Sequence, residues 1–147
     1  MKQFVRLGVV LAVLLALFAT VSAHEGREVA DGKYEIVFGW RVEPAYTNLL
    51  NGPEIEINTK GTDEQPVEGL DETLQLEVSY GGKSKILKLR AVPDQKGYYT
   101  SDLIPTQPGD YSFHLTGKIA DAAIDEVFDS SKGEFSSVNP ITDIQFP

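Results

Sequence analysis

Two histidines are the residues best suited to metal chemistry in this chain, because imidazole nitrogen binds copper and other transition metals at neutral pH. They are His24 and His114. If the chain is cut before His24, the amine and imidazole of that residue together chelate copper(II), and His114 and Glu25 can supply a further nitrogen and a carboxylate. Each histidine also has a simpler interpretation, since a histidine at a cleavage junction or on an exposed strand is commonly an ordinary surface residue.

The chain has no cysteine. This excludes a disulfide framework, a thiolate zinc site, an iron–sulfur cluster, a thiol nucleophile and a lipidated N-terminal cysteine. The hydrophobic core alone must therefore hold the fold, which a chain of 147 residues can do as one domain.

The first 23 residues differ in composition from the rest. Lys2 and Arg6 are their only charges, and the 13-residue apolar run LGVVLAVLLALFA spans residues 7–19. Val21-Ser22-Ala23 follows, with small residues where a signal peptidase needs them. These features predict a secretory signal peptide over 1–23. A retained N-terminal membrane anchor is the alternative, although the run is shorter than the roughly 20 residues of a spanning helix.

Charge argues against a nucleic-acid partner. The whole chain carries a net charge of −9, and removal of the two basic residues in 1–23 leaves 11 − 22 = −11. Such a surface is soluble and repels nucleic acid and anionic lipid. Together with the predicted signal peptide, this leads us to expect a location outside the cytoplasmic membrane, periplasmic or extracellular.

Other chemistry is less well supported by the residues. Trp40 and the six tyrosines could bind carbohydrate, but Trp40 lies on an apolar stripe typical of a core. No G-x-S-x-G, H-E-x-x-H or phosphate-loop motif is present, so we expect no enzyme. A cluster of acidic residues lacks the D-x-D-x-D-G loop of a calcium site and is more typical of a solvated strand edge. Its members are Asp121, Asp125, Glu126 and Asp129.

Alternation of apolar and polar residues predicts an antiparallel β-sandwich of about seven strands. Turns rich in Gly, Pro and Asn separate the strands, although the stretch ADAAIDE at 120–126 could instead be helical. The predicted organisation is a signal peptide at 1–23, an N-terminal arm at 24–32, a sandwich at 33–129 and an irregular C-terminal extension at 130–147. The predicted strands are 33–43, 54–58, 73–80, 86–89, 97–103, 110–116 and 124–128.

Residues 105–119, PTQPGDYSFHLTGKI, resemble the sixth strand of immunoglobulin-like domains, with Tyr111 at the position of their corner tyrosine. Further segments are similar to small secreted bacterial proteins and to the YtkA-like and CopC-like periplasmic β-sandwiches, some of which handle copper. The chain departs from the CopC type, which often has Met-rich segments, because its only methionine is Met1. The similar segments are AHEGREV at 23–29, GKYEIVFGWRVEPAYTNLLNG at 32–52, QPVEGL at 65–70 and ITDIQFP at 141–147.

These observations predict a secreted or periplasmic, non-enzymatic accessory binding module. Copper(II) at His24, His114 and Glu25 is its most concrete ligand. One alternative is a metal-free interaction domain that docks on an envelope or membrane protein. Another is a copper-dependent oxygenase of the N-terminal-histidine type, for which 124 residues are few.

Processing can be tested directly. We expect the exported protein to begin at His24, because the charged start, the apolar run and the Val-Ser-Ala junction fit a cleaved signal. Intact-mass measurement and N-terminal sequencing of protein from its native compartment check this. A chain that still carries Met1 would contradict cleavage and would leave the amine of His24 blocked.

Overall fold

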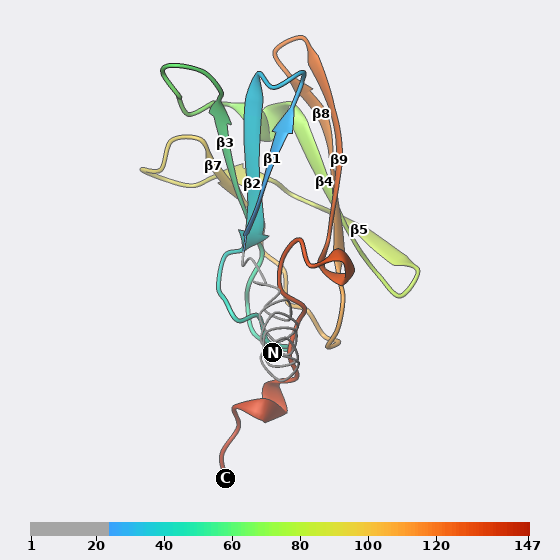
Figure 1. Cartoon of the computed structure of the whole chain (residues 1–147). Helices are drawn as coiled ribbons and strands as arrows, with labels where there is room; N and C mark the ends of the chain where they lie inside the picture. The colour runs from blue at the N-terminus through green and yellow to red at the C-terminus, as the bar shows by residue number, and fades with distance from the viewer. Residues whose placement is uncertain (1–23) are drawn as a thin grey trace, which may run out of the picture.

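A computed structural model describes residues 24–147 as two antiparallel β-sheets packed face to face (Figure 1). The predicted antiparallel β-sandwich is therefore confirmed, whereas the predicted signal peptide, residues 1–23, lies outside the described residues. The described residues form nine strands: β1 His24–Val29, β2 Tyr34–Trp40, β3 Pro53–Thr59, β4 Leu74–Tyr80, β5 Lys83–Leu87, β6 Arg90–Ala91, β7 Tyr98–Thr100, β8 Ser112–Ile119 and β9 Ala122–Asp129.

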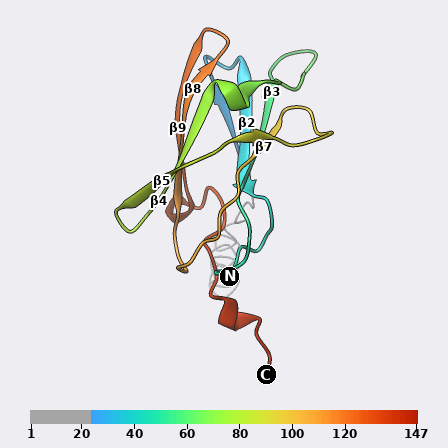
Figure 2. The same cartoon turned by 180° about the vertical axis from the view of Figure 1, so that it is seen from behind.

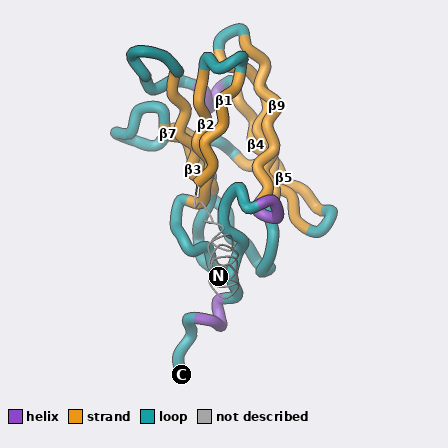
Figure 3. Tube along the Cα trace, in the orientation of Figure 1, coloured by secondary structure: helices purple, strands orange, loops and turns teal. Residues whose placement is uncertain are grey.

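The five-stranded sheet has the order β1-β2-β3-β7-β6, and the four-stranded sheet has the order β5-β4-β8-β9. The chain changes sheet after β3, after β5 and after β7, so that both layers are tied together repeatedly (Figure 2). Strands make up the body of the molecule and loops gather at its ends (Figure 3). The helical turns are three short 3-10 helices, η1 Leu70–Glu72, η2 Ser130–Lys132 and η3 Ile141–Asp143.

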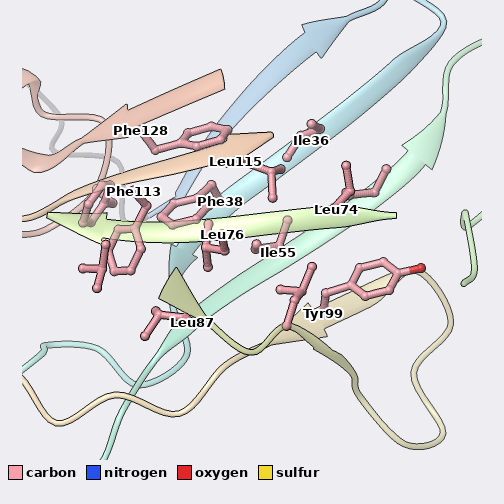
Figure 4. Close-up of a cluster of buried hydrophobic side chains, with 14 of the residues drawn as sticks. Ile36, Phe38, Ile55, Leu74, Leu76, Leu87, Tyr99, Phe113, Leu115 and Phe128 are labelled. Atoms are coloured by element: carbon pink, nitrogen blue, oxygen red, sulfur yellow. The ribbon is translucent and has the colours of Figure 1, made fainter. Parts of the chain in front are cut away.

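Aromatic side chains fill the space between the sheets, as the alternating pattern predicts (Figure 4). Phe38 of β2 stacks on Phe128 of β9 with ring centroids 4.4 Å apart, and it lies 5.2 Å from Phe113 of β8. Trp40 is 1% exposed and packs edge-on against Phe113 at 5.3 Å. Each side chain buried in this way contributes roughly 1.5–3 kcal/mol relative to an exposed one.

The predicted N-terminal arm is in fact largely strand. Residues 24–29 form β1 and pair with β2 along their full length. The alternation of apolar and polar residues is missing from β1. Its inward-facing residues beside Phe38 and Ile36 are the charged Glu25 and Arg27. Arg27 lies over the Phe128 ring at 4.5 Å, so its long side chain covers the open edge of the core.

Part of the predicted C-terminal extension contributes to the core, whereas its last residues are exposed. Phe135 and Val138 are 1% and 2% exposed, and Phe135 packs against Trp40 with centroids 5.9 Å apart. The indole Nε1 of Trp40 donates to the carbonyl of Ser136 at 2.7 Å. The stretch at 120–126 enters strand β9 at Ala122, so its helical alternative is wrong.

Tyr111 is buried just before β8, and its hydroxyl donates to the carbonyl of Gln107, four residues upstream, at 2.9 Å. Its ring lies 4.7 Å from that of Tyr80 and 6.0 Å from that of Trp40. Burial raises the pKa of the Tyr111 phenol, so the hydroxyl stays protonated and keeps its role as donor. This side chain thus joins the β7–β8 connection to the aromatic core.

Replacement of Tyr111 by Ala is expected to lower the free energy of unfolding by about 3–5 kcal/mol, the usual cost of truncating a buried aromatic ring. Tyr111→Phe keeps the ring and loses only the hydroxyl bond, so about 1 kcal/mol is expected. Urea denaturation of the two variants measures both values. Phe146→Ala is the matched control, because that ring is 96% exposed. Wild-type stability of Tyr111→Ala would contradict the structural role.

Candidate functional site

The structure separates the three predicted metal ligands. His24 lies at the start of β1, opposite Gly39, on the outer face of the five-stranded sheet. Its Nε2 is 3.9 Å from Oε1 of Glu54, the residue of β3 that pairs with Gly39 of β2. His114 lies on β8 of the other sheet, where its neighbours Phe113 and Leu115 point inward and the imidazole points outward. The two histidines therefore lie on opposite outer faces of the sandwich.

The remaining contacts of these residues also differ from a shared site. Glu25 points toward the interior and accepts from Nη2 of Arg27 at 2.7 Å, so its carboxylate is already neutralised. The Nε2 of His114 is 2.6 Å from Oδ1 of Asp125 on β9. Among residues 24–147, no group of three or more His, Asp or Glu side chains is arranged to hold a metal ion.

Burial and side-chain contacts argue against two other interpretations of the sequence, a carbohydrate platform at Trp40 and a calcium site. Trp40 is buried and its indole nitrogen is used within the fold, so it cannot be part of a carbohydrate platform. The acidic residues considered for calcium do not converge. Asp125 contacts His114, Glu126 accepts from Arg27 at 2.9 Å, and Asp129 caps η2 by accepting from the backbone of Ser131.

A different feature is an open groove of about 490 Å³ between the β4–β5 hairpin and the β7–β8 connection. The hairpin extends away from the body of the sandwich, as both views show (Figures 1 and 2). One wall is formed by residues 78–85 of the hairpin and the other by residues 103–107. Tyr111 lies between the two walls and lines the groove with its buried ring.

The hairpin wall is shaped by its turn. Gly81 and Gly82 have φ of 54° and 77°, the left-handed backbone that a tight two-residue hairpin of type I′ requires. The register pairs Tyr80 with Lys83 and Val78 with Lys85. Paired residues point to the same face, so the two lysines lie on the groove side with Val78 and Tyr80.

The other edge of β5 has no partner strand among the described residues. In a two-residue hairpin the residues that flank the turn are hydrogen-bonded to each other, and bonding then alternates. Lys83 and Lys85 are therefore bonded to β4, whereas the backbone groups of Ser84 and Ile86 point to the free edge. Ile86 itself is 57% exposed.

The second wall is held in place by hydrogen bonds and an ion-pair cluster. Asp102, at its base, accepts from Nη1 of Arg41 at 2.9 Å and from Nη2 of Arg90 at 3.0 Å. These two hydrogen bonds hold the pKa of the Asp102 carboxyl below its usual value. Leu103 forms a two-way backbone bridge with Asn51, which fixes the wall to the β2–β3 connection.

The groove is basic although the protein is acidic. Neither Lys83 nor Lys85 has a carboxylate within 4.0 Å among residues 24–147, and both are exposed. Five other basic residues do contact carboxylates: Arg27, Arg41, Lys60, Arg90 and Lys96. The apolar part of the groove consists of Val78, Leu103, Ile104, Pro105 and the tyrosine rings. A ligand that fits it must offer both negative charge and apolar side chains.

The chain matches no protein-family model, no curated protein and no solved structure. Within residues 24–147, no helix has the length and apolar character needed to cross a bilayer. The sequence predicts strands on both sides of Gly81-Gly82, at 73–80 and 86–89, but not the groove, because Lys83 and Lys85 look like ordinary surface lysines until the opposite wall is placed beside them.

Proposed function

We propose that this protein is an exported, non-enzymatic binding module that holds an extended acidic and apolar segment of an envelope protein against β5. The proposal rests on one observation: a groove whose two lysines have no ion pair among residues 24–147 runs beside an edge of β5 that no described strand pairs with. It corresponds to the metal-free interaction domain that the sequence left open.

Strand addition explains how such a groove would bind. An extended peptide placed along β5 can exchange main-chain hydrogen bonds with Ser84 and Ile86, which supply affinity without regard to sequence. Alternate side chains of that peptide would then point into the groove, where Lys83 and Lys85 select carboxylates and Leu103 and Ile104 accept apolar groups.

The same lysines limit unwanted pairing. A free edge strand tends to pair with any other exposed edge, including that of a second copy. Two copies of β5 would bring Lys83 and Lys85 of each chain close together, and this like-charge contact opposes self-association. An acidic partner is instead attracted by the lysines, so the edge favours such a partner over a second copy of the chain.

Charge reversal in the groove tests this function. A displayed library of random peptides, selected on the full chain, is expected to yield extended sequences with alternating acidic and apolar residues. Lys83→Glu combined with Lys85→Glu should lower the affinity for a selected peptide by at least about tenfold, because each charge-assisted hydrogen bond is worth roughly 1.5–3 kcal/mol. Titration calorimetry measures the change.

The control is Lys118→Glu combined with Lys132→Glu, since these lysines are also exposed, have no ion pair among the described residues and lie outside the groove. The control should bind the peptide like wild type. Failure to select any peptide, or equal weakening by both double variants, would contradict the proposed function.

A copper(II) site at His24 is a second candidate, favoured by the carboxylate of Glu54 at 3.9 Å from the imidazole. In a chain that begins at His24, the amine and the Nδ1 of the imidazole would chelate the ion, whereas Glu54, which lies beside Nε2, would orient the ring rather than bind the metal. The neighbouring Glu25 is not needed, because Arg27 already binds it. This candidate uses residues outside the groove, so the two functions are independent.

Three variants of the processed chain test copper binding by paramagnetic resonance and calorimetry. Glu54→Gln should weaken binding modestly, because it removes the carboxylate that orients the imidazole through Nε2, whereas His114→Ala should leave binding unchanged, because His114 lies on the other sheet. One extra residue before His24 should weaken binding strongly by moving the amine away. Affinity should fall as the pH drops, because protons compete for the amine and the imidazole. Loss of binding in His114→Ala would contradict this arrangement.

A further inference from the structure

The loops at one end of the sandwich and the C-terminal tail carry most of the exposed large hydrophobic side chains of residues 24–147. Eight large hydrophobic side chains are exposed, and six of them lie in the β2–β3 connection, the β7–β8 connection or the C-terminal tail. We call this surface the apolar end; its exposed members are Val42, Leu49, Leu50, Ile104, Ile144 and Phe146.

Charge is absent from the three segments that carry five of the six members of the apolar end, all except Val42. Residues 44–53, PAYTNLLNGP, contain no Asp, Glu, Lys or Arg. The same is true of residues 103–109, LIPTQPG, and of residues 144–147, IQFP. In a chain with 24% charged residues, three neighbouring uncharged segments mark a surface that can leave water at low cost.

Hydrogen bonds join the first two segments to each other and the first segment to residues 139–141, which precede the third. The backbone N–H of Asn48 donates to the carbonyl of Pro105 at 2.8 Å, and that of Thr47 donates to the carbonyl of Asn139 at 2.9 Å. The N–H of Ile141 donates to the hydroxyl of Thr47 at 3.0 Å. Backbone groups here are therefore partly satisfied inside the protein, which lowers the cost of bringing the loops into an apolar medium.

The chain itself indicates what lies against this end. His24 pairs with Gly39, next to Trp40 at the end of β2, so the chain enters the fold beside the β2–β3 connection. The apolar run of residues 7–19 precedes that entry point by a few residues. Whether this segment serves as a signal peptide or as an anchor, the apolar end is the part of the fold closest to the bilayer when the chain emerges from it.

We infer that the apolar end docks on the surface of a lipid bilayer, with Leu49, Leu50, Ile144 and Phe146 inserted at the level of the headgroups. The matching surface is zwitterionic, because residues 24–147 carry a net charge of −11 that anionic lipid would repel. The four side chains lie outside the groove, so docking leaves the β5 edge accessible to a partner in the same membrane.

Depth-dependent quenching tests this inference on the full chain in phosphatidylcholine nanodiscs. The absence of native cysteine allows a single fluorophore at Leu50→Cys or Phe146→Cys, with Ile86→Cys and Val127→Cys as controls, which are also exposed but lie on β5 and β9. Nitroxide-labelled lipid should quench the first pair strongly and the controls weakly. Equal quenching at all four positions would overturn the proposal.

A second arm separates docking from simple tethering by the N-terminal segment. With the fluorophore at Ile144→Cys, Leu50→Asp combined with Phe146→Asp should lower the ratio of docked to undocked protein by about a hundredfold, since each buried side chain is worth roughly tenfold. Ile86→Asp combined with Val127→Asp should leave it unchanged. Unchanged quenching in the first double variant would overturn the inference.

A second copy of the chain is the other occupant that the apolar surface could accept. In that case, dilution of labelled protein with unlabelled protein would change the fluorescence at position 50, and nitroxide lipid would have no effect. This result would also overturn the inference. Peptide selection by the groove would be unaffected by it, so the lipid inference and the proposed function can fail separately.

Discussion

Contact between Phe38 and Phe128 joins the two sheets, and much of the structure depends on it. Their rings stack at 4.4 Å, and Phe113 and Phe135 complete the cluster around Phe38 at 5.2 and 5.4 Å. Without a disulfide, this packing and the surrounding aliphatic side chains must hold the layers together. Trp40 and Tyr111 extend the cluster toward the loops, so the walls of the groove are supported by the same packing that stabilises the fold.

The outer edges of the two sheets differ in how they are protected from pairing with another strand, and β5 differs from the other edge strands. Arg27 of β1 bonds to Glu126 of β9, and together with Glu25 and Glu134 it closes that side with charge. Burial by itself would lower the pKa of Arg27, but these carboxylates outweigh it and raise the pKa. The edge at β6 is only two residues long. The free edge of β5 is the longest one without such protection, and it adjoins the groove.

Sequence patterns predicted the inner strands well and the boundaries poorly, for a physical reason. Strands β2, β4 and β8 have one face in the core and one near solvent, so apolar alternation identified them. Strand β1 was missed because its inward residues are charged and act at an edge rather than in the core. The proximity of His24 and His114 could not be judged from sequence, since it depends on which sheet each strand joins.

Charged and uncharged residues are distributed unevenly over the surface of the molecule. Acidic residues outnumber basic ones by 22 to 11 in residues 24–147, two lysines without an ion pair among those residues lie in the groove, and three segments of the apolar end carry no charge. A large net charge generally favours solubility and opposes non-specific contact, whereas uncharged loops lose less hydration than charged ones when they are buried. Because Leu103 and Ile104 belong to the loop that borders both features, the groove opens close to the apolar end. A partner segment that emerges from a membrane would therefore reach β5 across a short span of chain.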